Sequence, residues 1–142
     1  MAELIIQTSA AGVPPAFTGD TGDLVYFLSF AVAERYGSTH DLSGAARILR
    51  EQHRRDVLRP LLTFAEDNPA DPDDKHDMEQ IWQQPAPVAT AARLASDSIR
   101  SSELLLGLTR DFPDLLRRLD DLATIADWSA EQGARIRILF RL

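Results

Sequence analysis

Hydrophobic and polar residues alternate at both ends of the chain. Segment 134–142 (ARIRILFRL) alternates apolar residues with Arg135, Arg137 and Arg141, which is the period of two that indicates a β-strand with one apolar and one mostly basic face. Segment 3–9 (ELIIQTS) is short, apolar and β-branched, and it also favours a strand. Because an isolated two-stranded ribbon is only marginally stable in water, we expect these strands to pair with each other or to join a partner's sheet.

Two regions in the first half of the chain have helical periodicity. Residues 22–37 form the most apolar segment, between Thr21, a residue type that caps helix N-termini, and Gly37, a residue type that ends helices. We expect a central helix there, buried on several sides. A second helical region is predicted from about residue 41 to residue 66, with a kink or break at Pro60.

Three further helical segments are predicted in the second half. A short helix should run from about residue 74 to residue 83, and small apolar residues at helical spacing fill residues 88–106. Another helix should open near Pro113 and close at Gly133. Its apolar stripe is expected to be Leu115, Leu119, Leu122 and Ala126, and most leucines of segment 101–122 are expected in the core.

The pattern as a whole predicts a mainly α fold. We expect residues 1–142 to form one domain, because 142 residues can bury a sizeable core without a disulfide or a metal. The predicted architecture is a helical bundle of about five helices with short terminal strands. Within it, residues 1–20 form a strand and a loop arm, residues 67–74 an acidic loop, and residues 134–142 the C-terminal strand.

Composition and charge narrow the function classes. The net charge is −7, and segment 61–80 carries seven acidic residues against one basic residue, so the acidity is local. Cysteine is absent, which excludes disulfides and thiolate chemistry. In the acidic loop, Lys75 and His76 stand where a calcium loop needs an oxygen ligand and a glycine, so no metal is expected. We find no basic leader and no membrane-spanning apolar run, and we expect a cytoplasmic protein without a cofactor.

The arginine-rich segment 46–60 (ARILREQHRRDVLRP) is the main candidate for chemistry. Arg47 and His53 are separated by five residues, which resembles the arginine–histidine motif of the HEPN-type ribonucleases. That resemblance implies proton transfer by His53 and phosphate binding by Arg47. At about 100° per residue, however, His53 falls within the apolar stripe of this helix, and a hydrogen-bonded core role is the alternative.

A second hypothesis is nucleic-acid binding, because segment 42–62 resembles a helix-turn-helix whose second helix starts near Arg54. The turn has no glycine, and Pro60 would interrupt the recognition helix. The sequence pI near 4.8 also differs from the basic character that phosphate binding usually requires. Nucleic acid is therefore the less favoured partner.

The hypothesis that we favour is a small acidic helical module for protein–protein interaction, acting as an adaptor, regulator or inhibitor. The chain lacks a serine elbow, a glycine-rich phosphate loop and paired catalytic residues, so an enzyme is less expected. Arg47, Arg50 and Arg54 lie on one flank of the predicted helix, where guanidinium groups can bind carboxylates. The partner is expected to be another protein or a second copy of this chain.

Overall fold

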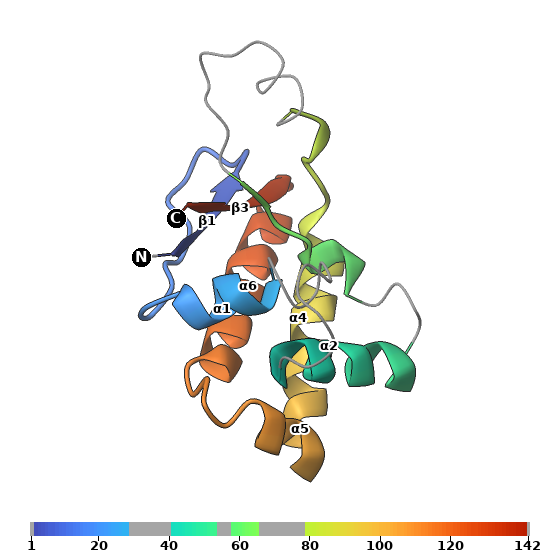
Figure 1. The fold of residues 1–142 in the computed structure, drawn as a ribbon. Helices are drawn as coiled ribbons and strands as arrows, with labels where there is room; N and C mark the ends of the chain where they lie inside the picture. The colour runs from blue at the N-terminus through green and yellow to red at the C-terminus, as the bar shows by residue number, and fades with distance from the viewer. Residues whose placement is uncertain (1, 29–40, 54–57, 66–78, 142) are drawn as a thin grey trace.

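The computed structural model describes residues 2–28, 41–53, 58–65 and 79–141, and these are mainly helical with a small sheet (Figure 1). The α-helices in the described part are α1 (Gly22–Tyr26), α2 (Asp41–Gln52), α4 (Pro85–Arg100), α5 (Glu103–Leu108) and α6 (Leu115–Glu131). A 3₁₀ turn, η2, spans Arg59–Leu61. The strands are β1 (Glu3–Thr8), β2 (Phe64–Ala65) and β3 (Ile136–Arg141).

The two terminal strands pair with each other. The sheet order is β1-β3-β2; β1 is antiparallel to β3, from Glu3 opposite Arg141 to Thr8 opposite Ile136. Both predicted terminal strands and one of the two predicted pairings are therefore confirmed. Since β3 has a neighbour on each side, its edges are occupied and it is not the strand that could extend a partner's sheet.

The third strand corrects the prediction for residues 41–66. Helix α2 ends at Gln52, and Phe64 and Ala65 form β2, which runs parallel to β3. The helical prediction is wrong for these two residues because long-range pairing with β3 decides the conformation of this short apolar run. Pro60 lies in the first positions of the 3₁₀ turn η2, where its missing N–H is tolerated.

Helices α4 and α6 lie side by side as an antiparallel pair (Figure 1). Ala92, Ala95 and Ser96 are fully buried and bring α4 close to its neighbour. The predicted stripe of α6 is confirmed, because its members are all fully buried: Leu115, Leu119, Leu122 and Ala126. Gly133 has a φ of +68°, the left-handed conformation expected just after a helix end.

The segment predicted as helical over residues 88–106 is divided. α4 ends at Arg100, and the side chain of Ser102 accepts a hydrogen bond from Leu105 N (3.2 Å) to open α5. The leucines of α5 are only partly in the core: Leu105 is fully buried, whereas Leu104 is 61% exposed. The amphipathic pattern therefore predicted the buried residues of α6 correctly, but in α5 it predicted more buried leucines than the structure has.

Two predicted segments lie only partly within the described residues. The start of the predicted central helix forms α1, and Leu24 and Phe27 are fully buried, while residues 29–40 lie outside the described residues. Residues 66–78, with the acidic loop, lie outside them too. Of the helix predicted from about residue 74 to residue 83, residues 79 and 80 are helical, whereas Gln83 forms an isolated antiparallel bridge with Ile136.

One hydrophobic cluster takes side chains from both terminal strands and from all the α-helices described here. The sheet covers one end of this cluster, and β1 lies beside α1 and α6 (Figure 1). On the basic face of β3, the Arg137 guanidinium lies 4.4 Å from the centre of the Trp82 ring. This stacking lets an arginine cover an aromatic surface at little desolvation cost.

Candidate interaction site

An open groove lies beside β1. Residues 2–6 form one wall, residues 13–17 and 19–21 form the other, and Ile125 of α6 also lines it. Its volume is about 670 Å³, and most of the lining is apolar. That volume is typical of sites that hold a small molecule or a short stretch of peptide.

The first wall is the outer edge of β1. Leu4 N donates to Thr21 Oγ1 (2.9 Å), whereas Ser9 N donates to the Arg135 carbonyl on the β3 side (2.9 Å). Successive residues of an antiparallel strand turn their N–H and C=O groups to opposite edges. The backbone N–H and C=O groups of the even-numbered residues of β1 therefore point to the outer edge, away from β3. In the described part of the chain, no group bonds to the amide N–H of Ile6.

The second wall is the N-terminal arm, which we define as residues 9–21. It has no regular secondary structure before α1. Pro14 and Pro15 have no N–H group, so this part of the arm cannot form a continuous ladder with β1. The arm therefore runs opposite β1 and leaves a groove between them.

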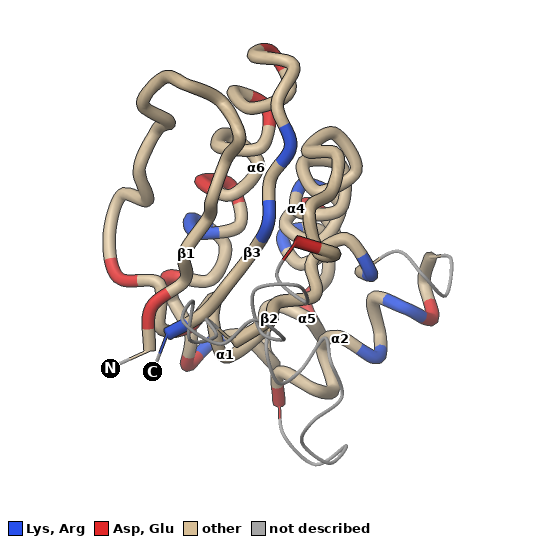
Figure 2. Tube along the Cα trace, turned by 90° about the horizontal axis from the view of Figure 1, so that it is seen from above, with Lys and Arg blue, Asp and Glu red and all other residues tan. Residues whose placement is uncertain are grey.

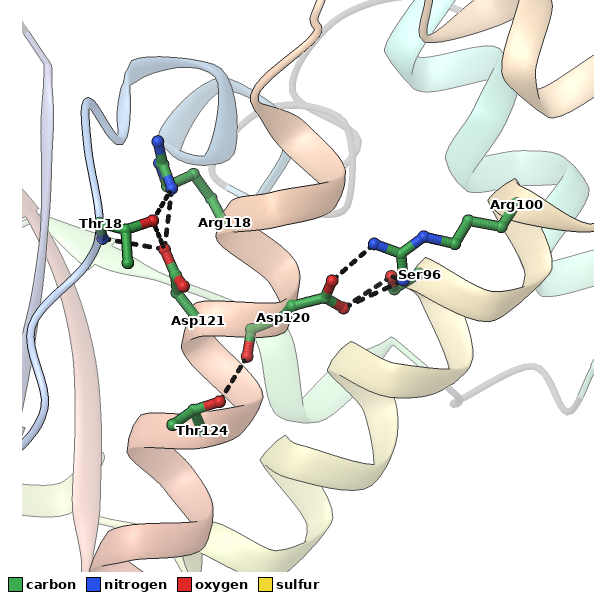
Figure 3. A network of polar contacts seen from close by, with 7 residues as sticks. All are labelled: Thr18, Ser96, Arg100, Arg118, Asp120, Asp121 and Thr124. Carbon is green, nitrogen blue, oxygen red and sulfur yellow. Dashed lines mark hydrogen bonds and ion pairs between the residues drawn. The ribbon is translucent and has the colours of Figure 1, made fainter.

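A polar cluster around the buried Arg118 side chain fixes the arm to α6 (Figure 3). Thr18 N and Thr18 Oγ1 both donate to Asp121 Oδ2 (3.0 and 2.8 Å). Arg118 donates through Nη1 to the same carboxylate oxygen (2.9 Å) and through Nε to the Asp20 carbonyl (3.0 Å). Burial favours the neutral form of Asp121, but these hydrogen bonds and the nearby guanidinium outweigh it and lower the pKa of its carboxyl.

Two glycines permit the close approach of the arm. A Cβ on Gly19 would lie 2.2 Å from Arg118 Nη2, and a Cβ on Gly12 would lie 3.2 Å from Trp128 Cζ2. The arm thus contacts α6 near both ends, at Arg118 and at Trp128. The wall is held in place before any partner arrives.

One end of the groove is acidic. Glu3 and Asp20 belong to the lining, which contains no basic side chain, and acidic positions gather where β1 begins and where the arm returns toward α1 (Figure 2). Nearby, burial raises the pKa of the Asp23 carboxyl; a hydrogen bond from the Asp114 backbone opposes this rise, and the negative charges of Asp114 and Asp20 add to it. The local potential at this end is therefore negative.

Arg47 and Arg50 of the predicted arginine flank lie on α2, away from the groove (Figure 2). Arg47 is exposed and makes no ion pair with the described residues. Arg50 is half-buried, and Arg54 lies outside the described residues. Of the flank members that the structure describes, Arg47 is the exposed one.

His53 is half-buried, and its Nε2 lies 2.9 Å from Ser98 Oγ on α4. A serine beside a histidine suggests a nucleophile and its base. Yet Ser98 lies inside α4, where backbone N–H groups are used by the helix, and no carboxylate of the described residues bonds to the second ring nitrogen. Without an orienting group or an oxyanion donor, this contact joins the end of α2 to α4.

The ribonuclease hypothesis also needs Arg47 close to His53. Six positions along a helix correspond to about 9 Å of rise and a rotation of about 120° between the two directions. Arg47 accordingly projects from an exposed face, while His53 turns toward α4. The structure does not bring the two side chains together.

The structure also does not contain the second helix that the helix-turn-helix hypothesis requires over residues 59–65. A recognition helix starting near Arg54 would continue through residues 59–65, but that stretch contains the η2 turn and β2.

For metal binding, His, Asp and Glu side chains do not gather in groups of three or more within the described ranges. None of the helices described here is long and apolar enough to cross a membrane.

The sequence prediction missed the groove and the cluster that supports it. One signal was present: at about 100° per residue, Arg118 lies between Leu122 and Ile125 on the apolar side of α6, and an arginine in that position must find partners.

Comparison with protein-family models, with curated proteins and with solved structures found no match. The groove is therefore interpreted from its own geometry.

Proposed function

We propose that this chain is a protein-interaction module, an adaptor, regulator or inhibitor, which binds a segment of a partner protein in the groove beside β1. The observation that carries the proposal is the groove itself, an open, mainly apolar surface of about 670 Å³ between two fixed walls. Exposed apolar surfaces of this kind commonly mark binding sites.

The walls support the proposal because binding would not have to organise them. β1 is held by β3, and the arm is held by Arg118 and Asp121. A preorganised site loses less conformational entropy on binding than a loop that must first become ordered. Val13, at 91% exposure, adds an apolar side chain that makes few contacts within this chain.

The exposed guanidinium of Arg47 supports a second, weaker contact surface on α2. Arginine is enriched at protein interfaces, where it binds carboxylates in a bidentate manner. The same reasoning makes an enzymatic role less favoured, since His53 and Ser98 lack the groups that catalysis would add. A second copy of this chain is the alternative partner for α2.

The proposal can be tested with a phage-displayed library of random peptides. The full chain is immobilised, the library is selected against it, and enriched sequences are synthesised and measured by calorimetry. Val13→Asn should weaken their binding by at least about fivefold, because one apolar side chain leaves the interface. Leu104→Asn, which changes an exposed leucine on α5 outside the groove, should leave the affinity unchanged.

Both variants change exposed side chains, so their free energies of unfolding should match that of the original chain. The proposal fails if selection enriches no sequence over an empty support. It also fails if the enriched peptides bind the Val13 variant as tightly as the unchanged protein.

A further inference from the structure

We infer that the groove receives an extended, apolar peptide segment as an additional strand on the edge of β1, with a basic residue of that segment beside Glu3 and Asp20. This inference rests on the proposed function and specifies its partner. It concerns the main chain of β1, the length of the groove and the charge at one end.

The main chain provides the strongest argument. The edge of β1 is open at Ile6, whose amide N–H has no acceptor among the described residues, while Leu4 N is already bonded to Thr21 Oγ1. An added strand would supply the missing acceptor. Strand addition to an exposed sheet edge is a common way to bind a peptide, because backbone hydrogen bonds give affinity whatever the side chains are.

The arm explains why this edge is still open. A segment with free N–H groups beside β1 could have completed the sheet within the chain, but Pro14 and Pro15 prevent regular pairing in the wall that faces it. The prolines therefore line the groove without filling the edge. Free strand edges are usually protected against chance pairing, and here the arm limits access to a single extended segment.

The dimensions favour a short segment. Residues 2–6 span roughly 13 Å at about 3.3 Å per residue. Because Thr21 Oγ1 already bonds to Leu4 N, backbone pairing with the peptide is centred on Ile6, and the rest of the short segment lies along the groove toward Glu3. In a strand, alternate side chains point to opposite faces. Every second side chain of the peptide would face Ile125 and the apolar lining, which favours apolar residues at alternate positions.

The charge favours a basic residue at one end of the segment. The two charged side chains of the lining, Glu3 and Asp20, are both acidic and both lie at the end where β1 begins. Glu3 is 63% exposed, and the nearest Arg141 nitrogen is 3.9 Å from its carboxylate, so it can accept another cation. A lysine or arginine at the corresponding end of the peptide would complement this charge.

A second copy of the chain is a poorer occupant. To pair β1 with β1, the second copy would have to enter the groove with its own arm beside the strand. The two arms would then compete for the same space between the strands. A single extended segment, which brings no arm of its own, avoids that conflict.

The test uses peptides from the library selection, made with N-methyl groups at one residue at a time. N-methylation removes a single backbone donor, so strand addition predicts weaker binding by about tenfold or more at every second residue, with little change between them. A loss that follows side-chain size alone, with no period of two, overturns strand addition while leaving the proposed function intact.

The charge is tested with Glu3→Lys, which should weaken binding by about five- to tenfold and make the affinity less sensitive to salt. The matched control is Glu51→Lys on α2, which should have no effect. Selected peptides should carry their basic residue at one constant end. Neutral or acidic residues at that end, or equal binding by both variants, would overturn the predicted contact of a basic residue with Glu3 and Asp20. Peptide-induced dimerisation in sedimentation would favour the second copy instead.

Discussion

Asp120 and Asp121 are neighbours on α6, and each meets an arginine, but the two clusters differ in burial (Figure 3). Arg118 and Asp121 are only 6% and 15% exposed as side chains, whereas Arg100 and Asp120 are 46% and 45% exposed. The first cluster fastens the arm to α6, and the second joins α4 to α6. Two adjacent aspartates that each pair with an arginine thus join α6 to different parts of the fold.

The two clusters should differ in how much stability is lost when the arginine is removed. The buried Arg118 side chain binds the Asp121 carboxylate and the backbone carbonyl of Asp20, so its removal would leave the largely buried Asp121 carboxylate without its cation. Arg100 pairs with Asp120, and Ser96 also donates to that carboxylate (2.9 Å). Water can replace much of an exposed pair, so the contribution of such a pair to stability is small.

The largest effect is expected for Arg118→Ala. It should lower the free energy of unfolding by about 3 kcal/mol, because removing one member of a buried ion pair leaves the other uncompensated. Urea denaturation measures the loss, and hydrogen exchange should show lower protection at Thr18 N, which bonds to Asp121. A loss below about 1 kcal/mol would mean that the two clusters are equivalent.

A smaller effect is expected for Gly19→Ala. The new Cβ would lie 2.2 Å from Arg118 Nη2, so the guanidinium must move and give up some of its bonds, at a cost of about 1–3 kcal/mol. Gly107→Ala is the matched control. Its Cβ would meet nothing within 4 Å, and alanine favours the helical conformation. Equal stabilities of the two variants would contradict close packing between the arm and Arg118.

The pH dependence should also distinguish the clusters. The pKa of Asp121 is lowered in the folded chain, as is that of Asp120 through Arg100, despite partial burial. A carboxyl with a lowered pKa stabilises the fold above its ordinary pKa, and this contribution is lost as the pH falls through the folded value. Unfolding free energies measured between about pH 5 and pH 2 should decrease with falling pH.

Arg118→Ala should flatten this acid dependence, because it removes the cation that helps to keep Asp121 ionised. Carboxyl ¹³C titration by NMR would show the pKa of Asp121 rising in the variant while that of Asp120 stays constant. An unchanged Asp121 titration would assign the lowered pKa to the Thr18 hydrogen bonds alone.

The smallest effect is expected for Arg100→Ala. An exposed arginine–aspartate pair contributes about 0–1 kcal/mol, so urea denaturation should show a change within that range. The arm should keep its hydrogen-exchange protection, since Arg100 does not contact it. Loss of arm protection in this variant would show that the two clusters are coupled through α6.

Local patterns were enough to predict several elements. The alternation at the chain ends located β1 and β3, and the leucine stripe located α6, because in each case the sequence period matches the face that is buried. The exposed position of Leu104 and the strand at Phe64 depend on contacts between distant residues, which local spacing cannot encode.

The candidate site was harder to predict for the same reason. The groove needs Thr18 and Asp121 to meet across a hundred residues of chain. In the sequence, Arg118 stands in a run, LLRRLDDL, that also suits a solvated helix face. Only the geometry shows that this arginine holds the arm that forms one wall of the groove.

The position of β3 between β1 and β2 has a consequence for the order of folding. Pairing Glu3 with Arg141 closes a loop of nearly the whole described chain, and such long-range closure is slow compared with forming helices or joining α4 to α6. We therefore expect the sheet to form late, after a helical intermediate stage of the folding reaction. The groove, whose first wall is β1, would then be among the last surfaces to mature, so partner binding would report completed folding.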